Sequence, residues 1–305
     1  MSDEVGGVFP VLPTIFASDG SLDIAGFAAV AEYAIGCGID GVVFPGLASE
    51  YDMLSLEERL QLIEILGRIA RGRVNFIVGA SSDRLEDSVT LARAGAAAGA
   101  IGAMVVTPRA DGADLGKLRA FYTALGDQAS LPIMVQNAPA PMGLGLSAEQ
   151  VLAIVEATGT IAWVKEENMP CGQRISRLLA ASPAGLRGVF GGAGGRYIID
   201  ELTRGAIGTM PAAETPEVHV ALMKAQRSGD AARVRALYEA MLPILMMQAV
   251  FRWRLTKEVL RRRGLIASAH TRAPGPEFDD GDHAELSQIL ERLEGFMARG
   301  QTETR

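Results

Sequence analysis

Residues 160–170 read TIAWVKEENMP, an apolar run that ends in an ammonium and two carboxylates. The β-branched and aromatic residues from Thr160 to Val164 predict a short buried strand. Because side chains alternate along a strand, Lys165 and Glu167 share one face and Glu166 lies on the other. The alternate apolar residues suit a face covered by helices, which directs Lys165 and Glu167 towards the inner face. This segment predicts a strand that ends at a pocket.

Similar short apolar runs recur along the chain between longer helical segments. The eight runs are VFPVLPTIF (8–16), GVVFPG (41–46), VNFIVGAS (74–81), GAMVVTP (102–108), PIMVQNAP (132–139), IAWVKE (161–166), LRGVFGG (186–192) and AIGTMPA (206–212). The segments between them, such as 56–71 and 85–99, place apolar residues at i, i+3, i+4 and i+7. Ser55 with Glu58, and Ser147 before 148–150, have the pattern of helix starts. Eight strands alternating with helices predict a (β/α)8 TIM barrel.

A doubly wound open sheet is the alternative α/β fold. It requires a glycine-rich phosphate loop after the first strand, where this chain reads ASDGSLD (17–23), a turn and a helix cap. The GGAGG segment at 191–195 resembles a dinucleotide loop but lacks the strand–helix context and the distal acid. A tight turn, or a close approach of the backbone to a ligand, is the favoured interpretation.

The pattern changes after the eighth run, where only helical segments follow, at 216–227, 230–263 and 284–299. We therefore expect a barrel catalytic domain at 1–229 and a C-terminal helical region at 230–305. No low-complexity linker separates the two, so the helical region is expected to pack on the barrel.

The net charge and apolar content disfavour several classes of partner. The chain has 305 residues, of which 49% are hydrophobic, and a formal net charge of −7. A negative charge disfavours nucleic acid and anionic membranes as main partners. The basic run at 252–263 contains apolar residues at helical spacing, which indicates a solvated helix face. No uninterrupted run of about 18 apolar residues occurs, so no membrane span is expected.

The cysteines and the N-terminus indicate the compartment. Cys37 and Cys171 are the only cysteines, too few for a disulfide scaffold and without metal-site spacing. Reduced thiols are the expectation. The opening MSDEVGG has no basic region followed by an apolar run, so no signal peptide is expected. The protein is expected to be cytoplasmic.

The predicted strand ends carry the candidate site residues, because barrel active sites lie at the carboxyl ends of the strands. Burial favours the neutral amine of Lys165, which is then a nucleophile towards carbonyls. A structural Lys165–Glu167 ion pair, or a lysine that reaches solvent, is the alternative. The other candidates at strand ends are Ala48, Ser49, Glu50, Arg109, Gln136, Asn137 and Gly208.

Several motifs occur in the order and at the strands of one known family. They are PTIFASDGSLD (13–23), GLASEYDMLSLEER (46–59), QNAPAPMG (136–143) and VKE (164–166). With them the chain resembles the dihydrodipicolinate synthase/N-acetylneuraminate lyase family of Schiff-base aldolases, over nearly its whole length. The resemblance implies that Lys165 forms an imine with a 2-keto acid, without a cofactor.

The chain departs from the synthase members of that family at the proton relay. Two tyrosines and a threonine of the synthases are matched by Gln136, Leu47 and Ala110, and none of these relays a proton in that way. The arginine that binds the aldehyde substrate's carboxylate is replaced by Pro141. Dihydrodipicolinate synthesis is therefore disfavoured.

The pattern is more similar to the family's 2-keto-3-deoxy-sugar-acid branch, including 2-keto-3-deoxyarabonate dehydratases. The shared features are Ser49-Glu50 after strand 2, VQNAP at 135–139, an acid at Glu167, and the tail pattern KEVLRRRGLI...RAP. The resemblance implies dehydration of a 2-keto-3-deoxy sugar acid, with Glu167 as base. Retro-aldol cleavage releasing pyruvate, and a keto-acid-binding paralogue without activity, stay as alternatives. The residues specify neither the chain length nor the stereochemistry of the sugar acid.

The other candidates have weaker assignments. Ser49 and the backbone N–H groups around Ala48 are expected to hold the substrate carboxylate, because anions suit a turn leading into a helix. Gln136 and Asn137 are expected to bond sugar hydroxyls or orient Lys165, and Arg109 to bind distal hydroxyls or a carboxylate. Glu50 is expected to fix the strand-2 loop through hydrogen bonds. The alternatives are a turn residue at Ser49, a structural role for Asn137 and an exposed loop position for Arg109.

No histidine-ligated metal is expected, because all three histidines (His219, His270 and His283) lie after the eighth run, beyond every predicted strand end. The resemblance implies a homodimer or homotetramer.

Overall fold

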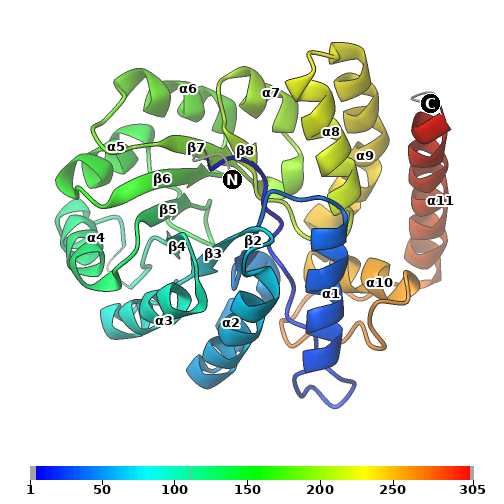
Figure 1. The fold of residues 1–305 in the computed structure, drawn as a ribbon, viewed down its shortest axis with the longest axis horizontal. Coiled ribbons are helices and arrows are strands. Elements are labelled where there is room, and N and C mark those ends of the chain that lie inside the picture. Colours follow the sequence, from blue (N-terminus) through cyan, green and yellow to red (C-terminus); the bar gives the residue numbers. More distant parts are fainter. Residues whose placement is uncertain (1–4, 111, 303–305) are drawn as a thin grey trace.

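Eight parallel strands alternate with helices in the part of the chain that the computed structural model describes, residues 5–110 and 112–302 (Figure 1). The strands are β1 (Gly7–Val8), β2 (Gly41–Phe44), β3 (Asn75–Gly79), β4 (Gly102–Val106), β5 (Ile133–Asn137), β6 (Ile161–Glu166), β7 (Gly188–Gly191) and β8 (Gly208–Thr209). Their order is β1-β8-β7-β6-β5-β4-β3-β2, and every named pairing is parallel. The predicted TIM barrel with C-terminal helices is confirmed.

The barrel closes between the segment after β1 and β2. Val11 bridges both Val43 of β2 and Ala212 beyond β8. The predicted first strand, 8–16, is largely wrong, because regular pairing covers only Gly7–Val8. Pro10 and Pro13 lack the N–H that a continuous ladder requires, so the segment joins the sheet by single bridges.

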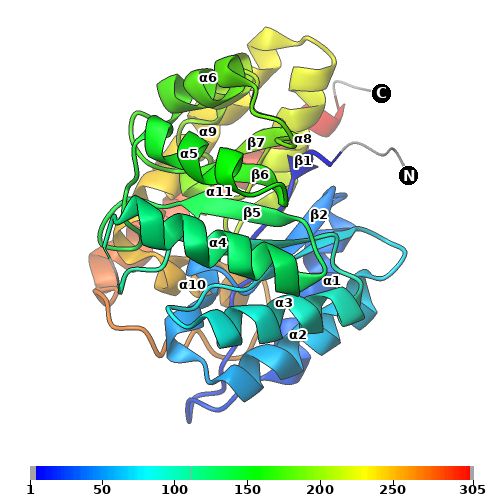
Figure 2. The same cartoon turned by 90° about the vertical axis from the view of Figure 1, so that its left-hand side faces the viewer.

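The helices form a ring around the strands. They are α1 (Ile24–Gly36), α2 (Leu56–Ala70), α3 (Leu85–Ala98), α4 (Leu115–Ala129), α5 (Ala148–Ala157), α6 (Cys171–Ala181), α7 (Ile198–Thr203) and α8 (Pro216–Arg227). Figure 2 shows α2 to α6 stacked in sequence along one side of the sheet. The predicted helix starts at Ser55 and Ser147 are confirmed, since each forms a reciprocal capping box.

Two apolar layers hold the barrel together. Side chains such as Val42 and Val164 point outwards and pack against the helices. Trp163 points inwards and packs with the residues that fill the barrel. The predicted alternation is therefore confirmed from Trp163 onwards, with Lys165 following Trp163 on the inner face. Ala162, one of the apolar residues expected to face the helices, instead packs with the residues that fill the barrel, because the pairing of β5 with β6 shifts register beside it.

Three further helices extend the barrel: α9 (Ala231–Phe251), α10 (Trp253–Arg262) and α11 (Asp280–Thr302). They lie together on one side, where α9 packs against α8, α10 and α11 (Figure 1). Val218 and Leu222 of α8 share a second apolar cluster with residues of α9 and α11, so this packing crosses residue 229. The division of the chain at residue 229 stays a prediction.

The single helix predicted at 230–263 is wrong, because it breaks at Arg252. This residue has φ 49° and ψ −119°, outside the helical region, and the chain turns there from α9 into α10. The last helix also begins at Asp280, four residues before the prediction. The break carries the α9–α10 junction across the mouth of the barrel, where its residues line the cavity described below.

One described helix, α9, is long and apolar enough by length and composition to cross a membrane. Its buried residues, among them Leu237, Met241 and Leu245, belong to the second apolar cluster. A helix buried in a protein core meets the same criterion, so the expectation that the chain has no membrane span stays a prediction.

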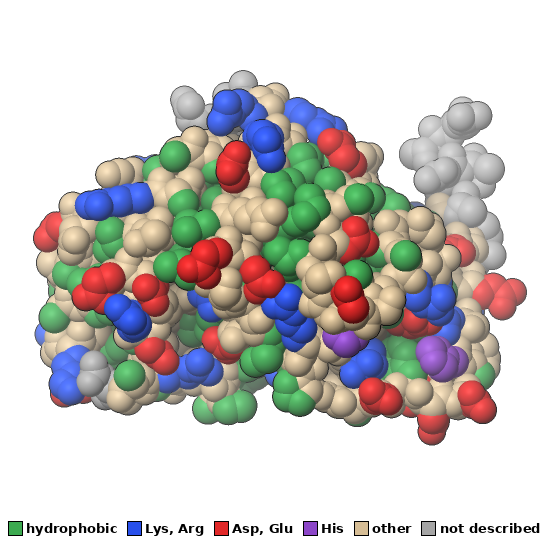
Figure 3. All heavy atoms as spheres, turned by 90° about the horizontal axis from the view of Figure 1, so that it is seen from below, with side chains coloured by type: hydrophobic (Ala, Val, Ile, Leu, Met, Phe, Trp, Pro, Cys, Tyr) green, Lys and Arg blue, Asp and Glu red, His purple; other side chains and the backbone are tan. Residues whose placement is uncertain are grey.

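Charged side chains of both signs are interspersed over the face drawn in Figure 3. Some charged side chains of the fold are paired, such as Arg272 with Glu58 at 2.7 Å between Nη2 and Oε1. A basic surface of one sign, the feature of nucleic-acid-binding proteins, is not seen on this face.

Candidate active site

The lysine at the end of β6 lies against a carboxylate. Lys165 Nζ is 3.2 Å from Glu167 Oε1, and the two side chains are 4% and 10% exposed. The backbone of Glu167 is still aligned with β5, since its N–H donates to the Asn137 carbonyl at 3.1 Å. The strand geometry therefore holds an amine and a carboxylate together inside the barrel mouth.

Two further donors fix the Glu167 carboxylate. Gln136 Nε2 donates to Oε2 at 2.6 Å, and the Ala193 N–H donates to Oε1 at 2.9 Å. Burial raises the pKa of Glu167, but the charge of Lys165 and these hydrogen bonds outweigh it and lower the pKa below its usual value. Glu167 is thus held ionised, as a base must be.

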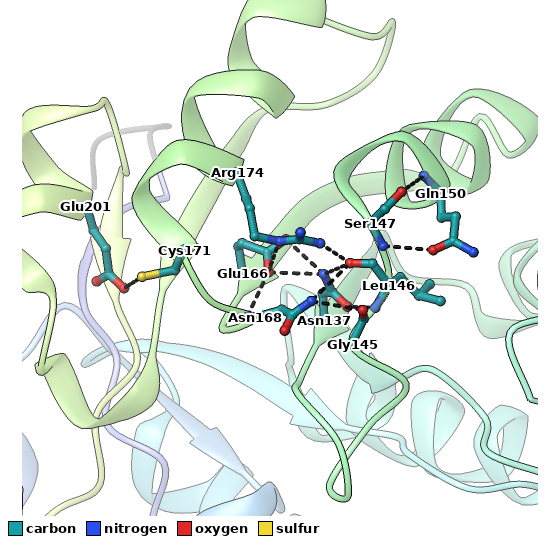
Figure 4. Close-up of polar contacts among 10 residues, drawn as sticks. All are labelled: Asn137, Gly145, Leu146, Ser147, Gln150, Glu166, Asn168, Cys171, Arg174 and Glu201. Carbon is teal, nitrogen blue, oxygen red and sulfur yellow. Dashed lines mark hydrogen bonds and ion pairs between the residues drawn. The ribbon is translucent and has the colours of Figure 1, made fainter.

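The neighbouring Glu166 points the opposite way, as predicted, into a network between β5, β6 and α6 (Figure 4). Its carboxylate accepts from Asn137 Nδ2 at 2.9 Å and lies 3.2 Å from Arg174 Nε. Asn137 also exchanges hydrogen bonds with the backbone of Leu146 at 3.0 and 2.9 Å. Asn137 is therefore committed to the fold, and the structure does not bring it to Lys165 and Glu167 as a substrate ligand.

A cavity of about 210 Å³ opens in front of Lys165 and Glu167. Its lining combines residues from the strand ends with residues from the α9–α10 junction. They are Val11, Leu47, Ala48, Met142, Lys165, Glu167, Ala193, Gly194, Arg196, Met210, Pro211, Ala212, Gln248, Ala249, Arg252, Trp253 and Thr256. An amine and a carboxylate on one wall suit addition to a carbonyl followed by proton transfer.

The turn after β2 reaches this cavity through Ala48, in the short helix η1 (Leu47–Ser49). Ser49 does not line it, because its hydroxyl donates to the Leu12 carbonyl at 2.5 Å and accepts from the Gly46 N–H at 2.9 Å. The predicted carboxylate contact through the Ser49 side chain is therefore not seen. The Ser49 N–H donates to the Gly46 carbonyl at 2.8 Å, so it is the N–H groups of Leu47 and Ala48, before this first helical bond, that suit an anion.

Glu50 fixes the strand-2 turn to the C-terminal helices. Its Oε1 lies 2.5 Å from Lys257 Nζ, and its Oε2 accepts from the Ala273 N–H at 2.7 Å. The side chains of Glu50 and Lys257 are both 0% exposed. Glu50 therefore fixes the strand-2 loop, as expected from the sequence, and it does not line the cavity as a substrate-binding residue.

The structure places Arg109 and Gly208 apart from the cavity. Arg109 Nη2 is 3.6 Å from Asp52 Oδ1 at a separate hollow. Gly208 lies between β1 and β7, where an added Cβ would come within 2.3 Å of the Gly7 carbonyl oxygen. Met210, two residues later, lines the cavity instead.

The GGAGG segment at 191–195 packs against buried polar side chains. A Cβ on Gly192 would lie 2.4 Å from Glu167 Oε1, and one on Gly195 would lie 2.8 Å from His219 Nε2. The glycines therefore let the backbone approach these side chains closely. The predicted tight turn is confirmed, since the Gly195 N–H donates to the Gly192 carbonyl at 2.8 Å, and a close approach to a ligand stays a prediction. Among the described residues, no three His, Cys, Asp or Glu side chains are grouped as metal ligands.

The sequence did not single out the cavity residues of the C-terminal helices. Trp253 Nε1 donates to the Leu47 carbonyl at 2.6 Å, and Arg252 lies over the Trp253 ring at 4.4 Å. Arg196 donates to Gln248 Oε1 at 2.9 Å. The sequence gives only a weak signal for these residues, because the basic run at 252–263 has helical spacing, which predicts a solvated face, and nothing in its spacing marks the break at Arg252.

Comparison with known proteins finds one matching family and several relatives that align over most of the chain. The model of the dihydrodipicolinate synthetase family matches residues 4–293. L-2-keto-3-deoxyarabonate dehydratase from Azospirillum brasilense is 30% identical over 299 residues, covering 96% of each chain. The 4-hydroxy-tetrahydrodipicolinate synthase of Maridesulfovibrio salexigens is 29% identical over 240 residues, covering 78% of this chain and 81% of the relative.

A third relative has a solved structure. The putative 2-dehydro-3-deoxy-D-gluconate aldolase YagE from Escherichia coli K12 is 26% identical over 291 residues, covering 94% of this chain and 96% of the relative. The crystal structure of YagE in complex with pyruvate superposes with a TM-score of 0.86, covering 95% of this chain and 98% of that one.

Proposed function

Because the chain belongs to the dihydrodipicolinate synthetase family, a family of aldolase and dehydratase lyases, we propose that Lys165 forms a Schiff base with a 2-keto acid. One observation carries this proposal. Lys165 Nζ lies 3.2 Å from Glu167 Oε1, with both side chains nearly buried on a cavity wall. A nucleophile and a base at this separation are the arrangement that covalent carbonyl chemistry requires.

The first steps use the ion pair directly. Glu167 accepts a proton from the Lys165 ammonium, and the neutral amine attacks the C2 carbonyl carbon of the keto acid. The hydroxyl of the resulting carbinolamine takes this proton from Glu167 and leaves as water, which restores the Glu167 carboxylate and leaves an iminium whose positive charge makes the C3 protons acidic. The substrate's C1 carboxylate lies at the first-turn N–H groups of η1, beside Ala48.

The preferred reaction is dehydration of a 2-keto-3-deoxy sugar acid. Glu167 removes a proton from C3, and the enamine that forms expels the C4 hydroxyl, which takes the proton from Glu167 and leaves as water. Hydrolysis of the imine then returns Lys165. The identity to a protein named L-2-keto-3-deoxyarabonate dehydratase supports this substrate class. Gln136 and the Ala193 N–H orient the Glu167 carboxylate for the transfer.

Retro-aldol cleavage is the second candidate, and the likeness to the putative aldolase YagE favours it. The same iminium would break at C3–C4 when a base removes the C4-hydroxyl proton, releasing pyruvate and an aldehyde. Synthesis of the dihydrodipicolinate precursor is disfavoured, because Gln136 and Leu47 replace the tyrosine and threonine of the synthase relay. A keto-acid-binding protein without turnover is a third possibility.

A product assay with a Glu167→Gln variant tests the proposal. With a panel of 2-keto-3-deoxy acids, NMR is expected to show loss of water without release of pyruvate. Replacing the base is expected to slow turnover by about 10²–10⁴-fold. Trapping of the imine by borohydride is expected to persist in the variant at a lower rate, because water then takes the Lys165 proton in place of Glu167. Pyruvate plus an aldehyde as products would establish the aldolase instead, and neither product with an intact imine would favour the binding protein.

Assembly and location are proposals as well. We expect a homodimer or a homotetramer in the cytoplasm. Light scattering during size-exclusion chromatography of the full chain would measure the mass, and a monomer at all concentrations would exclude both assemblies.

A further inference from the structure

The cavity wall holds two arginines besides the lysine. Arg196 follows the short helix η3 (Ala193–Gly195) after β7, and Arg252 stands at the α9–α10 junction. Both line the same cavity as Lys165 and Glu167. They therefore reach one space from parts of the chain that are 56 positions apart in sequence.

Neither arginine has a carboxylate partner within ion-pair distance among residues 5–110 and 112–302. Arg196 Nη1 donates to neutral acceptors, Gln248 Oε1 at 2.9 Å and the Leu245 carbonyl at 3.2 Å. Arg252 contacts the Met142 sulfur and stacks on Trp253. Two guanidinium groups are thus held in place by neutral groups and have no counter-ion of their own.

A buried carboxyl lies behind the wall but does not supply that counter-ion. Glu214 Oε2 accepts from Thr256 Oγ1 at 3.0 Å, and Thr256 lines the cavity. Burial raises the pKa of Glu214, which favours its neutral form. Its side chain is fully buried and does not itself line the cavity.

The charges that line the cavity do not cancel. Lys165, Arg196 and Arg252 contribute three positive charges and Glu167 one negative charge, which leaves a formal charge of +2. Burial and the positive charge of Arg196 both lower the pKa of Arg252, so this cation is destabilised where it stands. The whole chain has a net charge of −7, whereas the lining of this cavity has a formal charge of +2.

The backbone at Arg252 is also unusual. Its φ of 49° is one that residues with a Cβ rarely adopt, and such positions cluster at ligand sites. The conformation is fixed by the Arg252 N–H donating to the Gln248 carbonyl at 2.8 Å, and by Trp253 bound to Leu47 at 2.6 Å. The junction therefore presents the Arg252 guanidinium to the cavity from a defined position.

We propose that Arg196 and Arg252 bind a second carboxylate at the far end of the substrate, so that the enzyme selects dianionic 2-keto acids. This inference rests on the proposed function, which places the keto group at Lys165 and the C1 carboxylate beside Ala48. The two carboxylates of such a substrate neutralise the formal charge of +2 on the cavity lining. Guanidinium groups suit this task because they bind carboxylates through paired N–H donors.

Two ligands of equal carbon number test the proposal. Calorimetry compares 2-oxoadipate, with two carboxylates, and 2-oxohexanoate, with one. The wild-type chain is expected to bind 2-oxoadipate about 10- to 100-fold more tightly, the range for charge-assisted hydrogen bonds. The preference is expected to shrink as salt concentration rises.

Variants assign the preference to the two arginines. Arg196→Gln and Arg252→Gln are each expected to reduce it to about 3-fold or less, and Arg252→Lys to retain part of it. The variant Arg68→Gln removes one positive charge from an exposed ion pair on α2 and is expected to bind like the wild type. Pyruvate, which lacks the distal group, is trapped with borohydride in parallel.

The outcomes separate this inference from the proposed function. Equal binding of the two ligands by the wild-type chain would overturn the dianion preference, as would a preference unchanged in both Gln variants. An equal loss of pyruvate and 2-oxoadipate would assign the arginines to the C1 carboxylate and overturn the distal assignment. If pyruvate is never trapped while the preference persists in calorimetry, the Schiff base fails and the anion subsite stands.

Discussion

At the scale of single residues, the adjacent glycines Gly191 and Gly192 pack against two carboxyl groups whose pKa values are shifted in opposite directions. An added Cβ on Gly191 would meet Glu201 Oε2 at 2.0 Å, and one on Gly192 would meet Glu167 Oε1 at 2.4 Å. Glu167 has a cation and two donors, and its pKa is lowered. Glu201 accepts from the Cys171 thiol at 3.2 Å, and burial raises its pKa to about 7 (Figure 4). Local partners, and not burial alone, decide which carboxyl is ionised.

The raised pKa of Glu201 predicts a pH-dependent stability. Folding favours the protonated form, so this contribution is fully present below about pH 4.5 and is lost as the pH rises through about 7. A pKa shift of this size corresponds to about 3 kcal/mol in the free energy of unfolding between the two ends of this pH range. Burial raises the pKa of Glu166 to about 7 as well. Burial raises the pKa of Glu214 too, so Glu201→Gln is expected to remove one part of the combined fall in the free energy of unfolding and to leave the rest.

Urea unfolding at pH 5 and pH 7.5 measures this effect. The variant Glu285→Gln, on the exposed face of α11, is the control and is expected to keep the full fall. A fall in Glu201→Gln as large as that of the wild type would contradict the assignment.

At the scale of elements, the loop after β7 is shaped by what it packs against. Its glycines resemble a dinucleotide loop in sequence, but the backbone N–H of Ala193 is aimed at Glu167. The sequence predicts that the segment turns tightly. It does not predict the partner, because Glu167 lies 26 residues away and joins the loop only through the pairing of β6 with β7.

Gly192→Ala is expected to displace the base. The new Cβ would lie 2.4 Å from Glu167 Oε1, so the carboxylate must leave its place beside Lys165. We expect turnover to fall by about 10²-fold, the lower end of an acid–base contribution, with pyruvate trapping retained. Gly159→Ala is the matched control, because no atom lies within 4 Å of its added Cβ. Turnover of Gly192→Ala at the wild-type rate would argue against Glu167 as the base.

The periodicity of apolar residues predicts where strands and helices lie better than it predicts a break within a helical segment. All eight strands lie within or overlap the predicted runs, since each combines apolar residues with flanking turns. The break at Arg252 carries no glycine or proline, so helical spacing continues through it. The spacing therefore predicts a solvated helix face for the basic run that holds Arg252, with Trp253 among its apolar residues, and it places neither residue at the cavity. Their place at the cavity follows from tertiary contacts such as Trp253 with Leu47.

At the scale of the whole molecule, a buried ion pair joins the C-terminal helices to the barrel. Lys257 of α10 bonds Glu50 of the strand-2 turn and the His270 carbonyl, and stands 4.3 Å from the centre of the Phe16 ring. Burial lowers the pKa of Lys257 to about 8, in spite of the charge of Glu50. The same turn carries Ala48, so the ion pair connects α10 to the cavity.

Breaking this pair is expected to destabilise the fold. Lys257→Met leaves Glu50 buried without its cation, which costs about 3–5 kcal/mol in the free energy of unfolding. The double variant Lys257→Met/Glu50→Gln is expected to recover much of that loss. Arg68→Ala, in the exposed pair with Glu64, is the control and is expected to cost less than about 1 kcal/mol. If Lys257→Met lowers the free energy of unfolding by less than about 1 kcal/mol, the ion pair does not stabilise the packing of α10 on the barrel.

Chemical trapping of the imine measures directly whether Lys165 is the Schiff-base nucleophile. The full chain is incubated with pyruvate and borohydride, and the adduct is located by intact mass and peptide mass measurement. We expect one reduced pyruvate adduct per chain, on Lys165, and none in Lys165→Ala. No adduct, or an adduct on another lysine such as Lys257, would contradict this role of Lys165.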